Sequence, residues 1–95
     1  MAAYVIVDVD VKDPERYREY VASVPPSIEK YGGRFVVRGG RAENLEGEWQ
    51  PKRVVVLEFE SIERAQEWWS SEEYRKPKAM RQAASHANMI VVEGA

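Results

Sequence analysis

Five residues of this sequence have side chains that suit ligand chemistry: Asp8, Arg38, Trp49, Arg53 and Glu58. The guanidinium of arginine presents a planar fork of N–H donors that matches a carboxylate or a phenolate. A half-buried carboxylate can have a raised pKa and act as a general base. We therefore expect these five residues to bind a substrate, with Arg38 holding an anion and Asp8 and Glu58 as candidate catalytic bases. Trp49 and Arg53 lie at the end of a long loop, where they would close the mouth of a cavity.

The strands that position these groups are predicted by alternating apolar residues. Successive side chains of a strand lie on opposite faces of the sheet, so parity places Asp8, Arg38 and Glu58 on one face. The loop from Gly39 to Pro51 separates the second and third stretches, which together predict a long β-hairpin. The alternating stretches are residues 4–11, 34–38 and 53–60.

Two helical stretches lie between these strands. The first begins at Asp13-Pro14, where the carboxylate caps free amides and proline is preorganised for the first turn, and it ends at Gly32-Gly33. Pro25-Pro26 interrupts its apolar stripe and predicts a kink or a restart. The second begins after Ser61, and capping-box spacing predicts a restart near Ser71. Aromatic residues at helical spacing are expected in the core: Tyr17, Tyr20, Tyr31, Trp68, Trp69 and Tyr74.

A short final strand over residues 88–93 completes the order β-α-β-β-α-β. Right-handed crossovers then give a four-stranded antiparallel sheet with two helices on one face. We therefore predict an α+β, ferredoxin-like fold that forms one domain over residues 1–95. The final strand is apolar on both sides, so parity does not orient it.

The sheet face that carries Asp8, Arg38 and Glu58 is also expected to be partly apolar. A solvated sheet face is usually mostly polar, and an exposed apolar patch marks an interface or a binding groove. We therefore expect a homodimer in which two sheets pack face to face and leave a cavity for a small organic acid or an aromatic metabolite. The apolar members of this face are Tyr4, Ile6, Val36, Val54 and Val56.

Composition narrows the classes of partner and location. The formal net charge of −2 lacks the basic excess of a nucleic-acid surface. The chain has no cysteine, which excludes disulfides and thiolate nucleophiles. Its first residues lack a basic signal region, and no apolar run approaches the roughly 20 residues that a membrane helix needs. We expect a cytoplasmic protein that binds neither nucleic acid nor membranes.

Several stretches resemble an uncharacterised bacterial family, the one numbered 1330 among domains of unknown function. The resemblance rests on GGRFVVRGG, EGEWQPKRVVVLEFES, AQEWWSSEEYRKPKAMRQ and the terminal VVEG, and it covers nearly the whole chain. That family is similar to the dimeric α/β-barrel superfamily, which includes muconolactone-isomerase-like enzymes, cofactor-independent monooxygenases and haem-degrading proteins. The resemblance implies a ferredoxin-like protomer and a face-to-face dimer. It implies no settled activity.

Each candidate residue also has a structural interpretation. The charges Asp8, Arg38 and Glu58 would form a cross-strand salt-bridge cluster, and Trp49 would anchor the long loop to the body or to the dimer partner. His86 lies just before the final strand, and the asparagine and tryptophan that support haem in the superfamily do not align with it. The spacing of the glycines does not match a nucleotide-binding loop. A metal site would need Asp8, Asp10, Glu58 and Glu60 to converge as oxygen ligands. Strand carboxylates are usually solvated, so we expect no metal and no cofactor.

Three functions remain open. The first is a binding protein for a small acid or aromatic metabolite that, if catalytic, performs isomerase-like proton transfer. The second is a cofactor-independent oxygenase, which needs a more apolar cavity. The third is a non-catalytic structural or binding module.

Overall fold

The computed structural model describes residues 1–95, and none of its helices is long and apolar enough to span a membrane. Four strands and four helical segments follow one another along the chain. They are β1 Ala3–Val11, α1 Pro14–Ser23, α2 Pro25–Lys30, β2 Arg34–Arg38, β3 Val54–Phe59, α3 Ile62–Trp69, α4 Glu72–Ala84 and β4 Ser85–Glu93.

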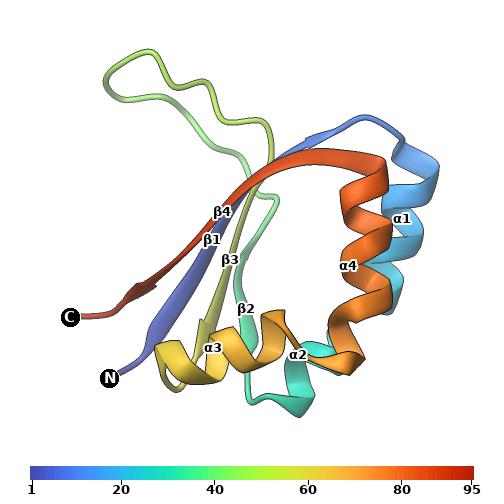
Figure 1. Ribbon diagram of the computed structural model, residues 1–95. Helices are drawn as coiled ribbons and strands as arrows, with labels where there is room; N and C mark the ends of the chain where they lie inside the picture. The colour runs from blue at the N-terminus through green and yellow to red at the C-terminus, as the bar shows by residue number, and fades with distance from the viewer.

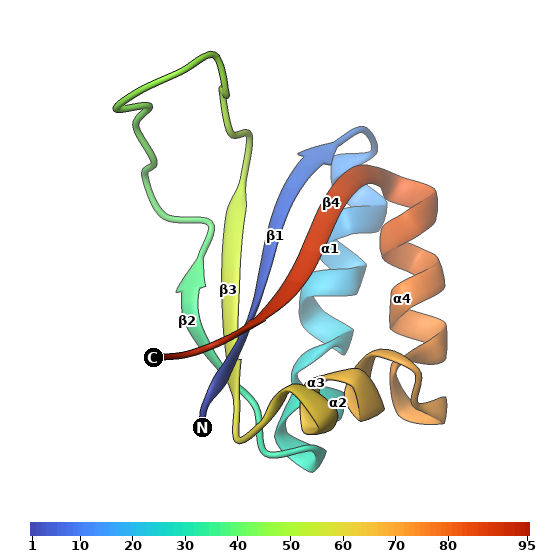
Figure 2. The same cartoon turned by 60° about the vertical axis from the view of Figure 1, so that its left-hand side comes forward.

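The four strands form one antiparallel sheet in the order β2-β3-β1-β4. All helices lie on one side of this sheet, as both views show (Figures 1 and 2). The inner strand β1 turns Val5, Val7 and Val9 toward the helices, where they are buried, and places the half-buried alternate residues on what we call the open face. The predicted α+β, ferredoxin-like fold is confirmed.

Both predicted helical stretches are broken at the expected places. Asp13 accepts the backbone N–H of Arg16 at the start of α1, and α2 begins separately at Pro25, because a proline has no N–H to continue the hydrogen-bond ladder. In the second stretch, Ser71 accepts the backbone N–H of Tyr74 at 3.1 Å and starts α4. The result is that α3 crosses one end of the sheet while α4 runs along it (Figure 1).

The core lies between the sheet and the helices, and its aromatic centre is Trp68. The indole stacks on Tyr74 with ring centroids 4.1 Å apart and packs against Phe59 at 5.4 Å. The prediction that Trp69 also belongs to the core is wrong, because its side chain is 45% exposed. Neighbouring residues of a helix point about 100° apart, so with Trp68 fully buried at the centre of the inner face, Trp69 lies at the margin of that face.

Strand β2 contains an irregularity that reverses its parity. Phe35 pairs with Leu57, but the next pair is Val37 with Val56, so Val36 is the extra residue of a β-bulge. Beyond the bulge, Val37 lies on the open face and Arg38 lies beside the helices. The predicted position of Arg38 is therefore wrong, since strict alternation had assigned it to the open face.

Strand β4 is longer than predicted and begins at Ser85, which places His86 within the strand and opposite Asp10. The register with β1 orients the whole strand. Ala87, Met89 and Val91 face the helices, whereas the open face receives His86, Asn88, Ile90 and Val92.

The connection between β2 and β3, residues 39–53, projects beyond the sheet. We call it the arm. In both views the arm leans away from the helices, on the side of the open face (Figure 2). It carries two exposed apolar side chains, Leu45 at 97% and Trp49 at 62% exposed.

Candidate functional site

The carboxylate of Asp8 anchors the arm to the sheet. It accepts the indole N–H of Trp49 at 2.9 Å and the backbone N–H groups of Lys52 and Arg53 at 2.9 and 3.3 Å. Partial burial would raise the pKa of Asp8, but the three hydrogen bonds outweigh that effect and hold the pKa below its usual value. The raised pKa expected for a general base is therefore not found at Asp8.

Glu58 lies at the opposite end of the open face. It accepts the hydroxyl of Tyr4 at 3.2 Å and binds the guanidinium of Arg34 at 2.5 and 2.6 Å. Glu58 pairs with Tyr4 of β1, four residues before Asp8, which corresponds to a separation of about 13 Å along the strand. Nowhere in the chain do three or more metal-ligating side chains come together.

Arg38 and Arg53 lie on the helix side of the sheet. Arg38 donates to the carbonyl oxygen of Val21 at 3.0 Å, and its guanidinium stacks over the ring of Phe35 at 4.0 Å. Arg53 packs against Gly39, where a Cβ would lie 2.2 Å from Nη1, and the positive φ of +72° at this position favours a glycine. The five predicted site residues are thus divided between two ends and two faces of the sheet.

The principal pocket lies between α3, α4 and the edge strand β4, mainly on the helix side of the sheet, and it also includes His86 and Ile90 of the open face. Its volume is about 470 Å³, within the range of small-molecule sites. Met89 and Val91 of β4 and Trp69 of α3 give it apolar surface, whereas Arg81 and Gln82 of α4 supply hydrogen-bond donors. The remaining lining residues are Val5, Ala65, Gln66, Ser85, His86, Ala87 and Ile90.

Sequence reasoning missed this pocket and expected a cavity between sheet faces. The sequence did contain one signal for the pocket. The predicted restart near Ser71 changes the direction of the chain, so no single continuous helix covers the last strand. The exposed Trp69 stands at that break and lines the pocket. None of the five predicted site residues lines it.

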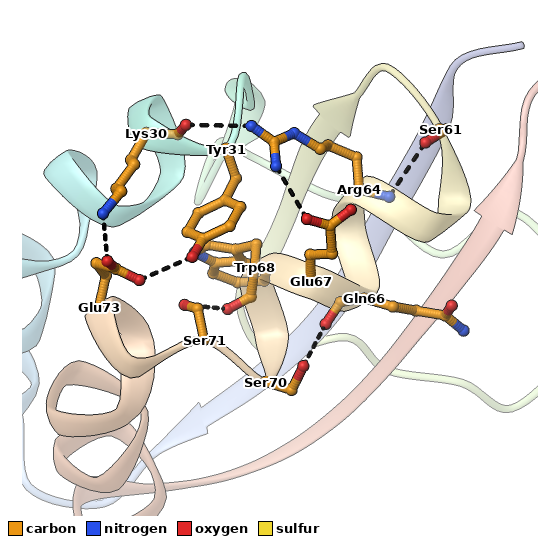
Figure 3. A network of polar contacts seen from close by, with 10 residues as sticks. All are labelled: Lys30, Tyr31, Ser61, Arg64, Gln66, Glu67, Trp68, Ser70, Ser71 and Glu73. Atoms are coloured by element: carbon orange, nitrogen blue, oxygen red, sulfur yellow. Dashed lines mark hydrogen bonds and ion pairs between the residues drawn. The ribbon is translucent and has the colours of Figure 1, made fainter.

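A polar network fixes the corner where α2, α3 and α4 meet (Figure 3). Glu73 of α4 accepts the ammonium of Lys30 and the hydroxyl of Tyr31, the latter at 2.8 Å. The hydrogen bonds from Lys30 and then Tyr31 lower the pKa of Glu73 to about 2. Arg64 of α3 binds Glu67 at 3.0 Å and reaches the carbonyl oxygen of Lys30 at 3.5 Å. This network holds the helix break that shapes the pocket.

Arg81 of α4 is the one charged residue among the buried side chains, with 6% of its surface exposed. Its Nε donates to the hydroxyl of Tyr74 at 3.2 Å, and that hydroxyl lies 3.2 Å from the hydroxyl of Tyr20. Burial, above all, raises the pKa of Tyr20, with the neighbouring Tyr74 adding to the effect. Arg81 lines both the principal pocket and a void of about 20 Å³ between α1 and the sheet.

Comparison with solved structures gives several proteins of the same fold. A protein of unknown function from Rhodopseudomonas palustris is 21% identical, with a TM-score of 0.81 over 99% of this chain and 82% of that one. A dimeric ferredoxin-like protein of unknown function from Jannaschia sp. CCS1 is 12% identical, with a TM-score of 0.73 over 99% and 100% of the two chains. SnoaB, a cofactor-independent oxygenase from Streptomyces nogalater, is 12% identical, with a TM-score of 0.64 over 99% and 92%. At these identities the likeness shows the fold alone.

Sequence comparison identifies the family but no characterised relative. No curated protein matches the chain. Residues 2–95, however, match the family described as "Domain of unknown function (DUF1330)". That match includes all four strands, the arm and every residue of the pocket, and the chain therefore belongs to the DUF1330 family.

Proposed function

We propose that this chain, acting as one unit over residues 1–95, is a homodimeric protein that binds a small, largely apolar molecule. The ligand would occupy the principal pocket between α3, α4 and β4. The observation that carries this proposal is the pocket itself: about 470 Å³, mostly apolar walls, and a few polar groups able to orient a ligand.

The proposed chemistry differs from the carboxylate-based proton transfer expected from the sequence. The pocket lining contains no aspartate or glutamate. Asp8 and Glu58 instead make hydrogen bonds and ion pairs within the protein. Binding of the ligand is therefore the function that the geometry supports best, and isomerase-like catalysis by Asp8 or Glu58 is not part of the proposal.

The pocket can be tested with a neutral fluorescent probe, N-phenyl-1-naphthylamine, titrated into the wild-type protein and an Ala87→Phe variant. Ala87 lines the pocket, so a phenyl ring there should occupy part of its volume and weaken probe binding at least fivefold. The matched control is Ala83→Phe, which adds the same ring at an exposed position on α4. Equal probe affinity in all three proteins would rule out this pocket as the binding site.

The homodimer is supported by the open face. Its side chains include four apolar residues that remain exposed in the protomer, although each belongs to a strand of the sheet: Val36, Val37, Ile90 and Val92. A second copy is the occupant that this face fits, because the arm leans to the same side and offers Leu45 and Trp49 to a partner sheet. The dimeric description of the Jannaschia protein supports the same assembly.

A second candidate function, cofactor-independent oxygenation, is favoured by the apolar character of the pocket. An oxygenase of this type would convert an activated methylene group and O₂ into a carbonyl group and water. SnoaB shares the fold. The test is oxygen uptake with the anthrone dithranol as probe: uptake above the uncatalysed rate that Ala87→Phe abolishes would support this function, and an unchanged rate would exclude it for anthrones.

A further inference from the structure

Arg81 is a buried cation without an anionic partner. None of the seven ion pairs in the structure includes Arg81, and only its Nε makes a hydrogen bond, to Tyr74. Its two terminal nitrogens, Nη1 and Nη2, bond to no protein group, yet neither is sealed from open space. A guanidinium is effectively always charged, so this side chain brings a positive charge into the interior.

The surroundings do not neutralise that charge. No carboxylate lines either hollow that Arg81 borders. The hydroxyl groups beside Arg81 are those of Tyr74 and, next to it, Tyr20, and burial keeps Tyr20 in its neutral form by raising its pKa. A buried charge without a counter-ion is unfavourable, and proteins rarely keep one that nothing satisfies.

Arg81 is also held in place. Tyr74 fixes Nε from one side and is itself buried and stacked on Trp68. The two free nitrogens are therefore presented by a side chain whose position is already determined, and such a preorganised fork suits the two oxygens of a carboxylate.

We propose that Arg81 is the anion receptor of the principal pocket and that the ligand is an aromatic or aliphatic carboxylic acid. This inference rests on the proposed function, since it names the ligand class of the same pocket. The carboxylate binds Nη1 and Nη2 at the inner end, and the apolar part of the ligand lies against Met89, Val91 and Trp69.

The test compares two probes of nearly the same shape, the anionic 1-naphthylacetate and the neutral 1-naphthylacetamide, each titrated by isothermal calorimetry. A charge-assisted pair of hydrogen bonds should give the wild-type protein a preference for the acid of roughly tenfold to a hundredfold. Arg81→Met should abolish this preference and leave amide binding unchanged, whereas Arg81→Lys should retain part of it. Arg75→Met, an exposed substitution on the same helix, should change neither affinity.

A second variant, Tyr74→Phe, keeps the guanidinium and removes the hydroxyl that orients it, and it should reduce the preference for the acid without affecting the amide. Equal wild-type affinities for the two probes, or a preference that survives Arg81→Met in a folded protein, would overturn the role of Arg81 alone. If neither probe binds and Ala87→Phe has no effect on the neutral fluorescent probe, the pocket itself is refuted, and this assignment with it.

Discussion

The two sides of the sheet differ in whether their charged side chains have partners within the protein. On the open face each carboxylate has its donors: Asp8 has Trp49 and two backbone amides, Asp10 has Lys12 at 2.9 Å, and Glu58 has Arg34. On the helix face, by contrast, Arg81 is buried and keeps two nitrogens unpartnered. A charge satisfied by its own chain maintains the fold, whereas for the buried charge that the chain leaves unsatisfied we have proposed a partner in the ligand. The comparison moves the candidate site from the face where the sequence placed it to the other.

The largest effect is expected at the open face, where we propose that a second copy binds. Ile90 is 59% exposed in the protomer and pairs with Ile6. The substitution Ile90→Glu would bury an unpaired carboxylate in the dimer interface at a cost of about 3 kcal/mol or more, which weakens association over a hundredfold. Sedimentation equilibrium at micromolar concentration should show a monomer for Ile90→Glu and a dimer for the wild type.

The control for this prediction is Ala79→Glu, which introduces the same charge at an exposed position on the helix side. It should leave the dimer intact. A wild-type protein that sediments as a monomer would contradict the proposed assembly directly.

An effect of intermediate size on the free energy of unfolding is expected at Asp8, whose charge has partners within the protein, and it can be compared with the effect at Arg81, whose charge has none. Asp8→Ala removes the acceptor of three hydrogen bonds and should lower the free energy of unfolding by about 1 kcal/mol, a modest value because the side chain is partly exposed. It should also shift the tryptophan emission spectrum, since Trp49 loses its partner. Urea denaturation followed by fluorescence measures both changes.

The counterpart is Arg81→Met, which replaces a buried cation by an apolar side chain of similar length. Without ligand, this substitution should leave the free energy of unfolding unchanged or raise it by about 1 kcal/mol. If Arg81→Met destabilised the protein more than Asp8→Ala, the distinction between the two faces would fail.

The smallest effect is expected at the corner network. The pKa of Glu73 is lowered to about 2 from 4.5, so its contribution to stability is fully present above about pH 4.5 and is lost as the pH falls toward 2. The difference in melting temperature between the wild type and Glu73→Gln should therefore favour the wild type at pH 6 and approach zero near pH 2. A difference that stays constant across this range would show that the ion pair with Lys30 adds nothing.

The sequence predicted the fold well because the fold depends on local patterns. A few neighbouring residues determine each of these patterns: the alternation of β1, the helix cap at Asp13 and the helix restart at Ser71. The position of Arg38 was not predictable in this way, because a single extra residue at Val36 reverses the face of everything that follows it in β2.

The candidate site was not predictable from the sequence, because it depends on contacts between residues that are far apart along the chain. Arg81 has the sequence surroundings of an ordinary helix-surface arginine, and only the packing of α4 against α1 and the sheet reveals that it is buried and unpartnered. Asp8 shows the opposite case. Its charge in a largely apolar strand suggested a ligand site, but its hydrogen bonds come from residues more than 40 positions away.

The bulge at Val36 also affects how molecules meet edge to edge. An edge strand offers unpaired N–H and C=O groups to any other extended chain, and bulges and short length are common protections against such pairing. Strand β2 has both, with five residues interrupted at Val36, whereas β4 at the other edge is regular over nine. Aggregation by strand addition should therefore start at β4, beside the mouth of the pocket, and a ligand seated there would slow it.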